Sequence, residues 1–268
     1  MRMSRVAVAT AAVATLAATG ACVRLSAVDS DGLWKVVGGQ CVPNMRDKGQ
    51  PGPCTTVDFQ KRYAVLKDIA GRAQYLVIPT DRVAGIESPE ILYGGAPEYW
   101  VGAWSAGRFV EAKLGMPLAG NQLGLEINSS ERRTQNQLHI HVDCMRPDIT
   151  EALAPYGDMA PGTWRWTTLD GSRYRVTRVT SLADRNNPFR VVERDLGPKE
   201  TMAVQTILVT GAGPDAQRNG WLIVNSGLNV DGGTGTAEGL LDHSCSLAQE
   251  KSASQSHLAG IVLARDAH

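Results

Sequence analysis

The chain has 268 residues, of which 43% are apolar and 20% are charged, as in an ordinary soluble globular protein. Its 27 basic residues balance its 27 acidic residues, so the formal net charge is zero. This balance argues against a nucleic-acid partner, which usually requires a basic excess. It does not exclude one anionic ligand, because a single pocket needs only a few Arg or Lys side chains.

The N-terminus has the pattern of an export signal. Arg2 and Arg5 precede an uninterrupted run of apolar and small residues from Val6 to Ala21, the order found in secretory signals and uncleaved anchors. A run of about 16 to 18 residues is at the short limit for crossing a bilayer. Small residues also precede Cys22, as at a lipoprotein processing site. We therefore expect residues 1–25 to be a signal peptide or membrane anchor, with lipidation of Cys22 as an alternative. Either would place the rest of the chain at the extracytoplasmic (periplasmic) face of the cell membrane.

Four further cysteines predict two disulfides, because their number is even and the chain has an export signal. Cys41 and Cys54 share one Pro/Gly-rich stretch, so a local bridge between them is the simplest expectation. That bridge leaves Cys144 to pair with Cys245. A zinc site made of all four is the competing interpretation, although none of them has the close spacing of paired zinc-binding cysteines.

The first half of the chain predicts the order strand, strand, helix, strand, strand. Residues 26–60 are rich in turn formers, with a short helical piece before Cys41. Runs of apolar and β-branched residues then predict strands, and near-helical spacing of aromatic residues predicts a helix that Gly115 ends. These elements are a hairpin of strands at 63–68 and 74–79, a helix at 97–114, and strands at 123–128 and 137–144.

The second half is less clearly patterned. The predicted elements are strands at 174–180, 189–193, 203–210 and 221–225, and a helix at 236–251. Their order loosely mirrors that of the first half, but no sequence repeat is strong enough to assert. We therefore predict an α+β fold in which an accessory part packs on the sheet of the first half.

The strand predicted at 137–144 alternates strictly between polar and apolar residues. The polar residues are Gln137, His139, His141 and Asp143, and the apolar ones are Leu138, Ile140 and Val142. Period-two alternation puts the apolar set into the core and the polar set on the other face. His139 and His141 then lie about 6.6 Å apart along one face of a rigid strand.

Such a pair of histidines has three interpretations. It can be an exposed pair without a role, or part of a metal site that takes a third ligand from His243, His257, His268 or a carboxylate. The third interpretation is nucleophilic catalysis at phosphorus, because a neutral imidazole attacks phosphate well near neutral pH. The neighbouring imidazole would then protonate the departing oxygen or orient the nucleophile.

Several segments resemble the bacterial CDP-diacylglycerol pyrophosphatase family, a branch of the histidine-triad superfamily. They include Val65-Leu-Lys-Asp, Gln74-Tyr-Leu-Val-Ile-Pro-Thr, Glu87-Ser-Pro, Cys41-Val-Pro-Asn, Arg146-Pro-Asp, Asp242-His-Ser-Cys and the run Ile127-Asn-Ser-Ser-Glu-Arg-Arg-Thr-Gln-Asn-Gln-Leu-His-Ile-His. The resemblance covers residues 33 to 250 and agrees with an N-terminal membrane segment. It implies a histidine-triad-like antiparallel sheet with packed helices.

The resemblance also implies roles for the two histidines. The superfamily has three alternating histidines, the middle one being the nucleophile. With Gln137 in the first place, His139 is the nucleophile and His141 its partner in the triad. In the other register, His141 is the middle residue and Asp143 is the last. Gln137 can form hydrogen bonds but cannot titrate, so this chain departs from the pattern of the superfamily.

The resemblance further implies the residues that bind the substrate. Asn128, Thr134 and Gln135 match the places that hold the phosphate. Asp68 matches an acidic residue that binds the ribose hydroxyls, although a plain turn residue is the alternative at this position.

Together these features predict an enzyme in residues 26–250, followed by a C-terminal tail at 251–268. The expected reaction is hydrolysis of CDP-diacylglycerol to CMP and phosphatidate through a nucleotidyl-histidine intermediate, without a metal or other cofactor. The expected partners are the lipid substrate and a membrane surface, and the superfamily leaves room for a homodimer. The alternatives are a broader hydrolase of nucleoside-diphosphate derivatives and a non-catalytic lipoprotein that binds a metal or ligand.

Overall fold

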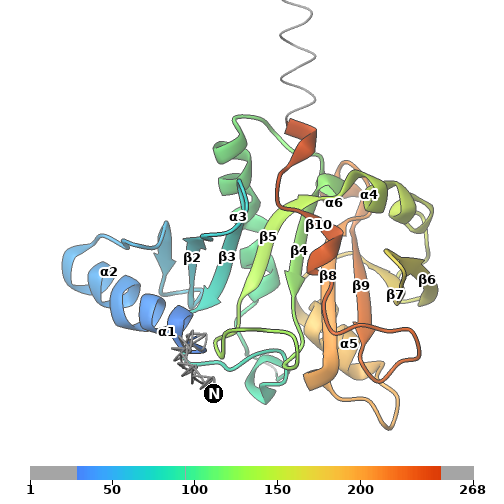
Figure 1. The fold of residues 1–268 in the computed structure, drawn as a ribbon, viewed down its shortest axis with the longest axis horizontal. Coiled ribbons are helices and arrows are strands. Elements are labelled where there is room, and N and C mark those ends of the chain that lie inside the picture. The colour runs from blue at the N-terminus through green and yellow to red at the C-terminus, as the bar shows by residue number, and fades with distance from the viewer. Residues whose placement is uncertain (1–28, 94, 249–268) are drawn as a thin grey trace, which may run out of the picture.

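The computed structural model describes residues 29–93 and 95–248. These residues build one ten-stranded sheet in the order β1-β2-β3-β5-β4-β8-β9-β7-β6, with β10 paired to β5 (Figure 1). The predicted signal or anchor at 1–25, Cys22 and the predicted tail at 251–268 lie outside the described residues. Among the described helices, none is both long and apolar enough to cross a membrane.

All neighbouring strands are antiparallel. The strands are β1 (Thr56–Asp58), β2 (Tyr63–Lys67), β3 (Tyr75–Pro79), β4 (Leu123–Ile127), β5 (Ile140–Met145), β6 (Arg165–Leu169), β7 (Ser172–Val179), β8 (Gln205–Gly211), β9 (Trp221–Gly227) and β10 (Leu241–Asp242). The α-helices are α1 (Gly32–Val36), α2 (Val42–Lys48), α3 (Tyr99–Leu114), α4 (Pro147–Leu153), α5 (Pro188–Arg194) and α6 (Ala216–Asn219). The α+β class is therefore confirmed, as are the predicted hairpin β2–β3, the helix α3 and the strands β4, β7, β8 and β9.

Helix α3 packs closely on the sheet because small residues line one of its faces. A Cβ atom at Gly102 would lie 2.7 Å from the ring of Tyr63, and one at Gly107 would lie 2.4 Å from Leu123. Only glycine therefore permits this approach of helix and sheet. The helix ends as predicted at Gly115, which has a φ of 72° and forms a left-handed cap.

The backbone repeats one unit within the chain. The order β2–β3–α3–β4–β5 recurs as β6–β7–α5–β8–β9, and both sets of strands have the same order within the sheet. The two units meet where β4 pairs with β8, with Leu125 opposite Val209. Helices α3 and α5 share one hydrophobic core, in which the rings of Trp100 and Phe189 are 5.1 Å apart. The sequence alone did not establish this repeat.

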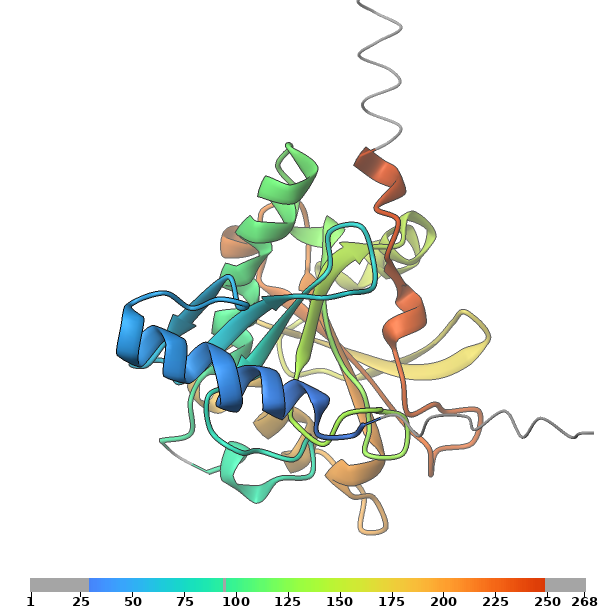
Figure 2. The same cartoon turned by 60° about the vertical axis from the view of Figure 1, so that its left-hand side comes forward.

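The opposite face of the sheet carries a polar band between two apolar coverings. Helices α1 and α2 cover the sheet beside β2 and β3, and residues 145–153 and 237–241 cover it beside β8 and β9 (Figure 2). In one row across neighbouring strands lie Leu76, His141, Glu126 and Leu208. Polar side chains at the centre of this row are thus enclosed by apolar residues on both sides.

The strand predicted at 189–193 is wrong, because this segment forms helix α5. Its Phe-Arg-Val-Val-Glu sequence is rich in β-branched and aromatic residues, which favour strands. The preceding residues decide otherwise. Asn187 caps the helix by accepting a hydrogen bond from the Phe189 backbone N–H, and Pro188 occupies the first helical position.

The helix predicted at 236–251 is also wrong over most of its described length. Glu238–Leu240 form a short 3-10 turn, and β10 then pairs with β5. Beyond β10 the Asp242 side chain accepts hydrogen bonds from the backbone N–H groups of Ser244 and Ser246, which makes a tight turn. Pairing with β5 therefore overrides the local helical pattern.

In the N-terminal region the predicted helical piece is present but longer than expected. It continues from α1 through a π-helical turn at Val37–Cys41 into α2, and strand β1 follows. Strand β6 and helix α4 were likewise missed. The predicted strand at 137–144 begins only at Ile140, so the first histidine of the pair lies just before β5.

Both predicted disulfides are present. Cys41 and Cys54 have Cα atoms 5.6 Å apart, and Cys144 and Cys245 have Cα atoms 5.5 Å apart. The first bridge closes the loop after α2, and the second ties β5 to the segment that follows β10. Bridges of this kind are typical of proteins that fold in an oxidising compartment.

Candidate active site

A pocket of about 570 Å³ opens on the polar band of the sheet. All six residues that the sequence proposed for the site line it: Asp68, Asn128, Thr134, Gln135, His139 and His141. They come from the end of β2, from the loop between β4 and β5, and from β5 itself. Apolar side chains of α1, β2 and β3 form the opposite wall, among them Leu33, Val36, Leu66 and Leu76.

His139 is oriented by the backbone just before β5. Its Nδ1 lies 2.7 Å from the carbonyl oxygen of Gln137. A carbonyl oxygen can only accept a hydrogen bond, so Nδ1 carries the proton and Nε2 keeps a free lone pair. The Gln137 side chain turns away and donates hydrogen bonds to the carbonyl oxygens of Pro79 and Asp81. Gln137 therefore holds the loop after β3 and does not line the pocket.

His141 lies beside His139, and the ring centroids are 5.1 Å apart. Its Nδ1 is 2.5 Å from the side-chain amide of Gln74. Its Nε2 is buried and has no hydrogen-bond partner among the described residues. Of the two imidazoles, His139 is thus the one with a free nitrogen suited to attack, and His141 supports its position.

Burial keeps both imidazoles uncharged. It lowers the pKa of His139 to about 4, and the neighbouring His141 adds to this effect. Burial likewise lowers the pKa of His141 to about 4, with a further contribution from His243. A neutral imidazole is the nucleophilic form, so His139 is ready to attack near neutral pH.

The proposed phosphate-binding side chains differ in how far they are already hydrogen-bonded within the protein. Gln135 accepts a hydrogen bond from the Leu33 backbone N–H and donates one to the carbonyl oxygen of Asp29, so its amide anchors the start of α1. Asn128 donates to Glu238 at 3.2 Å. Thr134 is exposed at the rim of the pocket. Thr134 is therefore better placed to contact a ligand than Asn128, whose free Oδ1 is buried, or Gln135.

Asp68 forms a turn and also lies at the pocket. Its carboxylate accepts a hydrogen bond from the Ala70 backbone N–H, as in a turn, and it also lines the pocket. Lys67, its neighbour, donates to the carbonyl oxygens of Asp68 and Gly71. One oxygen of Asp68 thus shapes the turn, and the carboxylate can still face a ligand.

Two adjacent arginines of the β4–β5 loop have different surroundings. Arg133 forms a two-pronged ion pair with Glu87, in which its guanidinium side chain is only 10% exposed. Arg132 lines the pocket and forms no ion pair with any carboxylate in residues 29–93 and 95–248. An unpaired guanidinium beside two histidines is a ready partner for a phosphate. Sequence analysis did not single out Arg132.

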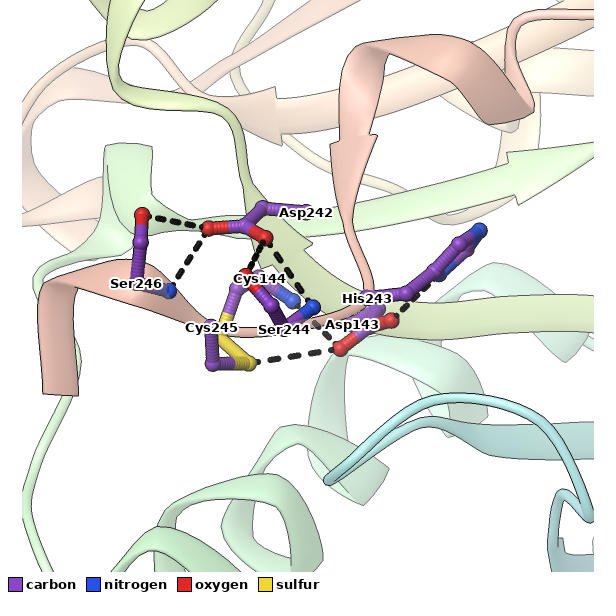
Figure 3. Close-up of a disulfide and its surroundings, with 7 residues drawn as sticks. All are labelled: Asp143, Cys144, Asp242, His243, Ser244, Cys245 and Ser246. Carbon is purple, nitrogen blue, oxygen red and sulfur yellow. Dashed lines mark hydrogen bonds and ion pairs between the residues drawn. A yellow bond between two sulfur atoms is a disulfide. The ribbon is translucent and has the colours of Figure 1, made fainter. Parts of the chain in front are cut away.

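A second group of titratable residues adjoins the pocket and was also missed. His243 Nδ1 lies 2.8 Å from Asp143 Oδ2 (Figure 3), and its Nε2 lies 3.6 Å from Glu238 Oε1. Glu238 itself lines the pocket. Nearby, Glu126 is buried, and burial raises its pKa to about 8. Sequence analysis named His243 only as a possible third metal ligand, and the resemblance of the Asp242-His-Ser-Cys segment to the family was a further hint.

The donor atoms of the described residues offer one cluster close enough for a metal ion, made of Asp143, Cys144 and Cys245. Its two sulfur atoms are joined in the disulfide, so they are not free thiolates. The cluster includes neither histidine of the pocket.

The chain is similar to known proteins over most of its length. The sequence profile described as CDP-diacylglycerol pyrophosphatase matches residues 28–249. A relative from Yersinia pestis, described as a CDP-diacylglycerol pyrophosphatase, is 35% identical over 234 residues. The matched residues are 85% of this chain and 89% of the relative. Residues 28–249 include every side chain of the pocket and both disulfides.

Proposed function

This chain belongs to the CDP-diacylglycerol pyrophosphatase family, and from this premise we infer that it hydrolyses CDP-diacylglycerol to CMP and phosphatidate through a nucleotidyl-histidine intermediate. Membership supports the hydrolytic activity. The covalent mechanism rests on one observation in the pocket, which is that His139 has a fixed proton on Nδ1 and a free Nε2.

The reaction would proceed in two displacements at phosphorus. His139 Nε2 attacks the cytidylyl phosphorus, and the bond to the phosphatidate oxygen breaks with its electron pair. Attack leaves a positive charge on the imidazole, which the Gln137 carbonyl oxygen stabilises through Nδ1–H. Water then attacks the same phosphorus and releases CMP, and the electron pair of the P–N bond returns to Nε2.

The pocket offers a distinct surface for each part of the substrate. Arg132 and Thr134 at the rim would hold the diphosphate by charge and hydrogen bonding. Asp68 would accept hydrogen bonds from the ribose hydroxyls. Leu66 and Val36, in the apolar wall beside Asp68, would cover a face of the cytosine ring. This arrangement would bring the cytidylyl phosphorus toward His139.

The experiment is an incubation of purified protein with CDP-diacylglycerol labelled in the cytidine. CMP and phosphatidate should appear, and quenching at alkaline pH, where phosphoramidates survive, should leave label on His139. The variant His139→Ala should show neither turnover nor label. Label on His141 would support the other register, and activity that a chelator abolishes without any label would replace the covalent mechanism. A CDP-alcohol without acyl chains, cleaved equally well, would point to the broader hydrolase.

We further propose that the enzyme works at the extracytoplasmic face of the membrane, held there by its N-terminal segment. The apolar run at 6–21 and the two disulfides support this location. Protease added to intact spheroplasts should digest the protein, and protection of the folded part would mean that the topology is reversed.

A further inference from the structure

The pair of histidines leaves the acid–base chemistry of the reaction without a donor. His141 was expected to protonate the departing oxygen, but burial lowers its pKa to about 4, so it is uncharged near neutral pH. Its Nε2 is also buried. An efficient general acid needs a proton to give and access to the leaving group. A neutral imidazole is a weak acid and this one is buried, so a residue that is charged near neutral pH is better suited to supply the proton.

His243 has the geometry that His141 lacks. Its Nδ1 lies 2.8 Å from the carboxylate of Asp143, which is fully buried, while the His243 side chain is 39% exposed. Its Nε2 lies 3.6 Å from Glu238 Oε1, and the same oxygen lies 3.9 Å from His141 Nδ1. A buried carboxylate that holds Nδ1–H leaves Nε2 free on the side of Glu238, which lines the pocket, and this is the arrangement of an acid–base histidine.

The fold fixes this histidine from several sides. Asp143 and His141 are two residues apart on the same face of β5. The segment that carries His243 is paired to β5 through β10. A disulfide also joins Cys144, the residue after Asp143, to Cys245, two residues after His243. Figure 3 shows the disulfide directly beside the Asp143–His243 pair. The Arg72 backbone N–H also donates to the His243 carbonyl oxygen.

We propose that His243, oriented by Asp143, is the acid–base residue of the site. This proposal rests on the proposed function. In the first step the His243 Nε2 proton passes to the phosphatidate oxygen as the P–O bond breaks. In the second step Nε2 removes a proton from water as the water oxygen bonds to phosphorus and the P–N bond breaks. His243 is then protonated again, and His139 regains its lone pair. Asp143 is a positioning residue, because it acts only through His243.

The surrounding charges favour the protonated form of His243. The hydrogen bond to Asp143 raises its pKa above 6.5, and burial works against this effect. Burial raises the pKa of Asp143, but hydrogen bonds from His243 and the Cys144 backbone N–H favour its carboxylate. The titratable groups that act on or face His243 from the neighbouring elements are Asp68, Glu126, His141, Asp143 and Glu238.

The test compares the wild-type enzyme with His243→Gln and Asp143→Asn, using kcat/KM for CDP-diacylglycerol as a function of pH. The wild-type value should fall as pH rises through the pKa of His243, because the acid form is required in the first step. His243→Gln should lower kcat/KM by about 10² to 10⁴-fold and remove this alkaline fall. Asp143→Asn should also lower kcat/KM and weaken its fall at alkaline pH.

Two controls separate catalysis from folding. In His243→Ala, added imidazole should restore part of the turnover, because the site is open enough to admit it. Glu90→Gln replaces an exposed carboxylate that does not line the pocket, so it should keep the wild-type pH profile. Near wild-type activity in His243→Gln would overturn the proposal. So would an unchanged pH profile in His243→Gln together with a loss of turnover in His243→Ala that imidazole does not reverse. Absence of label on His139 in the wild-type enzyme would instead defeat the proposed covalent mechanism, and absence of CMP would defeat the proposed function.

Discussion

Glu126 is a buried carboxylic acid at the centre of the sheet, and its replacement by Gln should change how stability depends on pH. Its Oε1 accepts hydrogen bonds from the Ala237 backbone N–H and the Thr206 hydroxyl, while Oε2 has no partner among the described residues. Burial is the main cause that raises its pKa from 4.5 to about 8 in the folded protein. Glu126 is therefore protonated near neutral pH, and Gln has the same shape and charge as this form.

The raised pKa of Glu126 fixes the sign of the effect. Because the folded-state pKa exceeds the unfolded value, its favourable contribution is complete below 4.5 and is lost as pH rises through about 8. Between about pH 5 and about pH 9 the wild-type protein should lose about 4 kcal/mol of unfolding free energy relative to Glu126→Gln. Near pH 5 the two proteins should differ by only about 1 kcal/mol, because each buries one unpaired polar group at the Oε2 position.

Urea denaturation at several pH values measures this difference directly. The matched control is Glu90→Gln, which replaces an exposed carboxylate and should leave the pH dependence of the wild-type protein unchanged. If Glu126→Gln kept the wild-type pH dependence, the carboxyl would be ionised in the folded protein. The account of a neutral, tightly enclosed row beside His141 would then be wrong.

Three further outcomes are expected. Arg132→Ala should raise KM for CDP-diacylglycerol without loss of stability. Arg133→Ala should instead lower the unfolding free energy by about 1 to 3 kcal/mol, because it leaves the half-buried carboxylate of Glu87 unpaired. Equal effects of the two variants on KM would contradict the assignment. Since the pKa of His139 is lowered to about 4, kcat/KM should not fall as pH drops from neutrality to about 5, as it would for an imidazole of pKa 6.5. Loss of the Cys245 bridge by Cys245→Ser should cost about 2 to 5 kcal/mol and reduce turnover. Cys41→Ser should lower stability without changing turnover. Unchanged turnover in folded Cys245→Ser would show that the Cys144–Cys245 disulfide does not position His243.

Local pattern and the family resemblance together predict which residues line the pocket. Alternation at 137–143 is enough to place His139 and His141 side by side, because strand geometry fixes which residues share a face. The same pattern cannot show that Gln137 turns toward the loop after β3. It also cannot show that the Gln135 side-chain amide is hydrogen-bonded to the start of α1. Which polar groups stay free depends on segments far away in the sequence.

His243 shows why the rest of the site escapes such reasoning. It lies 100 residues from Asp143 in the chain, and β10, the disulfide and a backbone hydrogen bond from Arg72 hold it beside Asp143. The segment around it has helical spacing, so local preference predicts the wrong structure there. A similar conflict occurs at α5, where Asn187 and Pro188 outweigh the β-branched residues that follow. In both places a few fixed contacts override a broad local preference.

The repeated unit explains how one chain builds an enclosed site. On the face of the sheet that carries the pocket, the second unit is apolar, because Leu222 and Val224 of β9 pack against Leu240 and Leu241. That packing fixes the segment after β9, in which Glu238 and His243 flank Leu240 and Leu241 and lie beside the first unit. The second unit thus seats the residues that complete the pocket of the first. A catalytic base that arrives this way depends on packing and a disulfide formed elsewhere in the fold, so stability of the second unit and acid–base chemistry in the first are physically coupled.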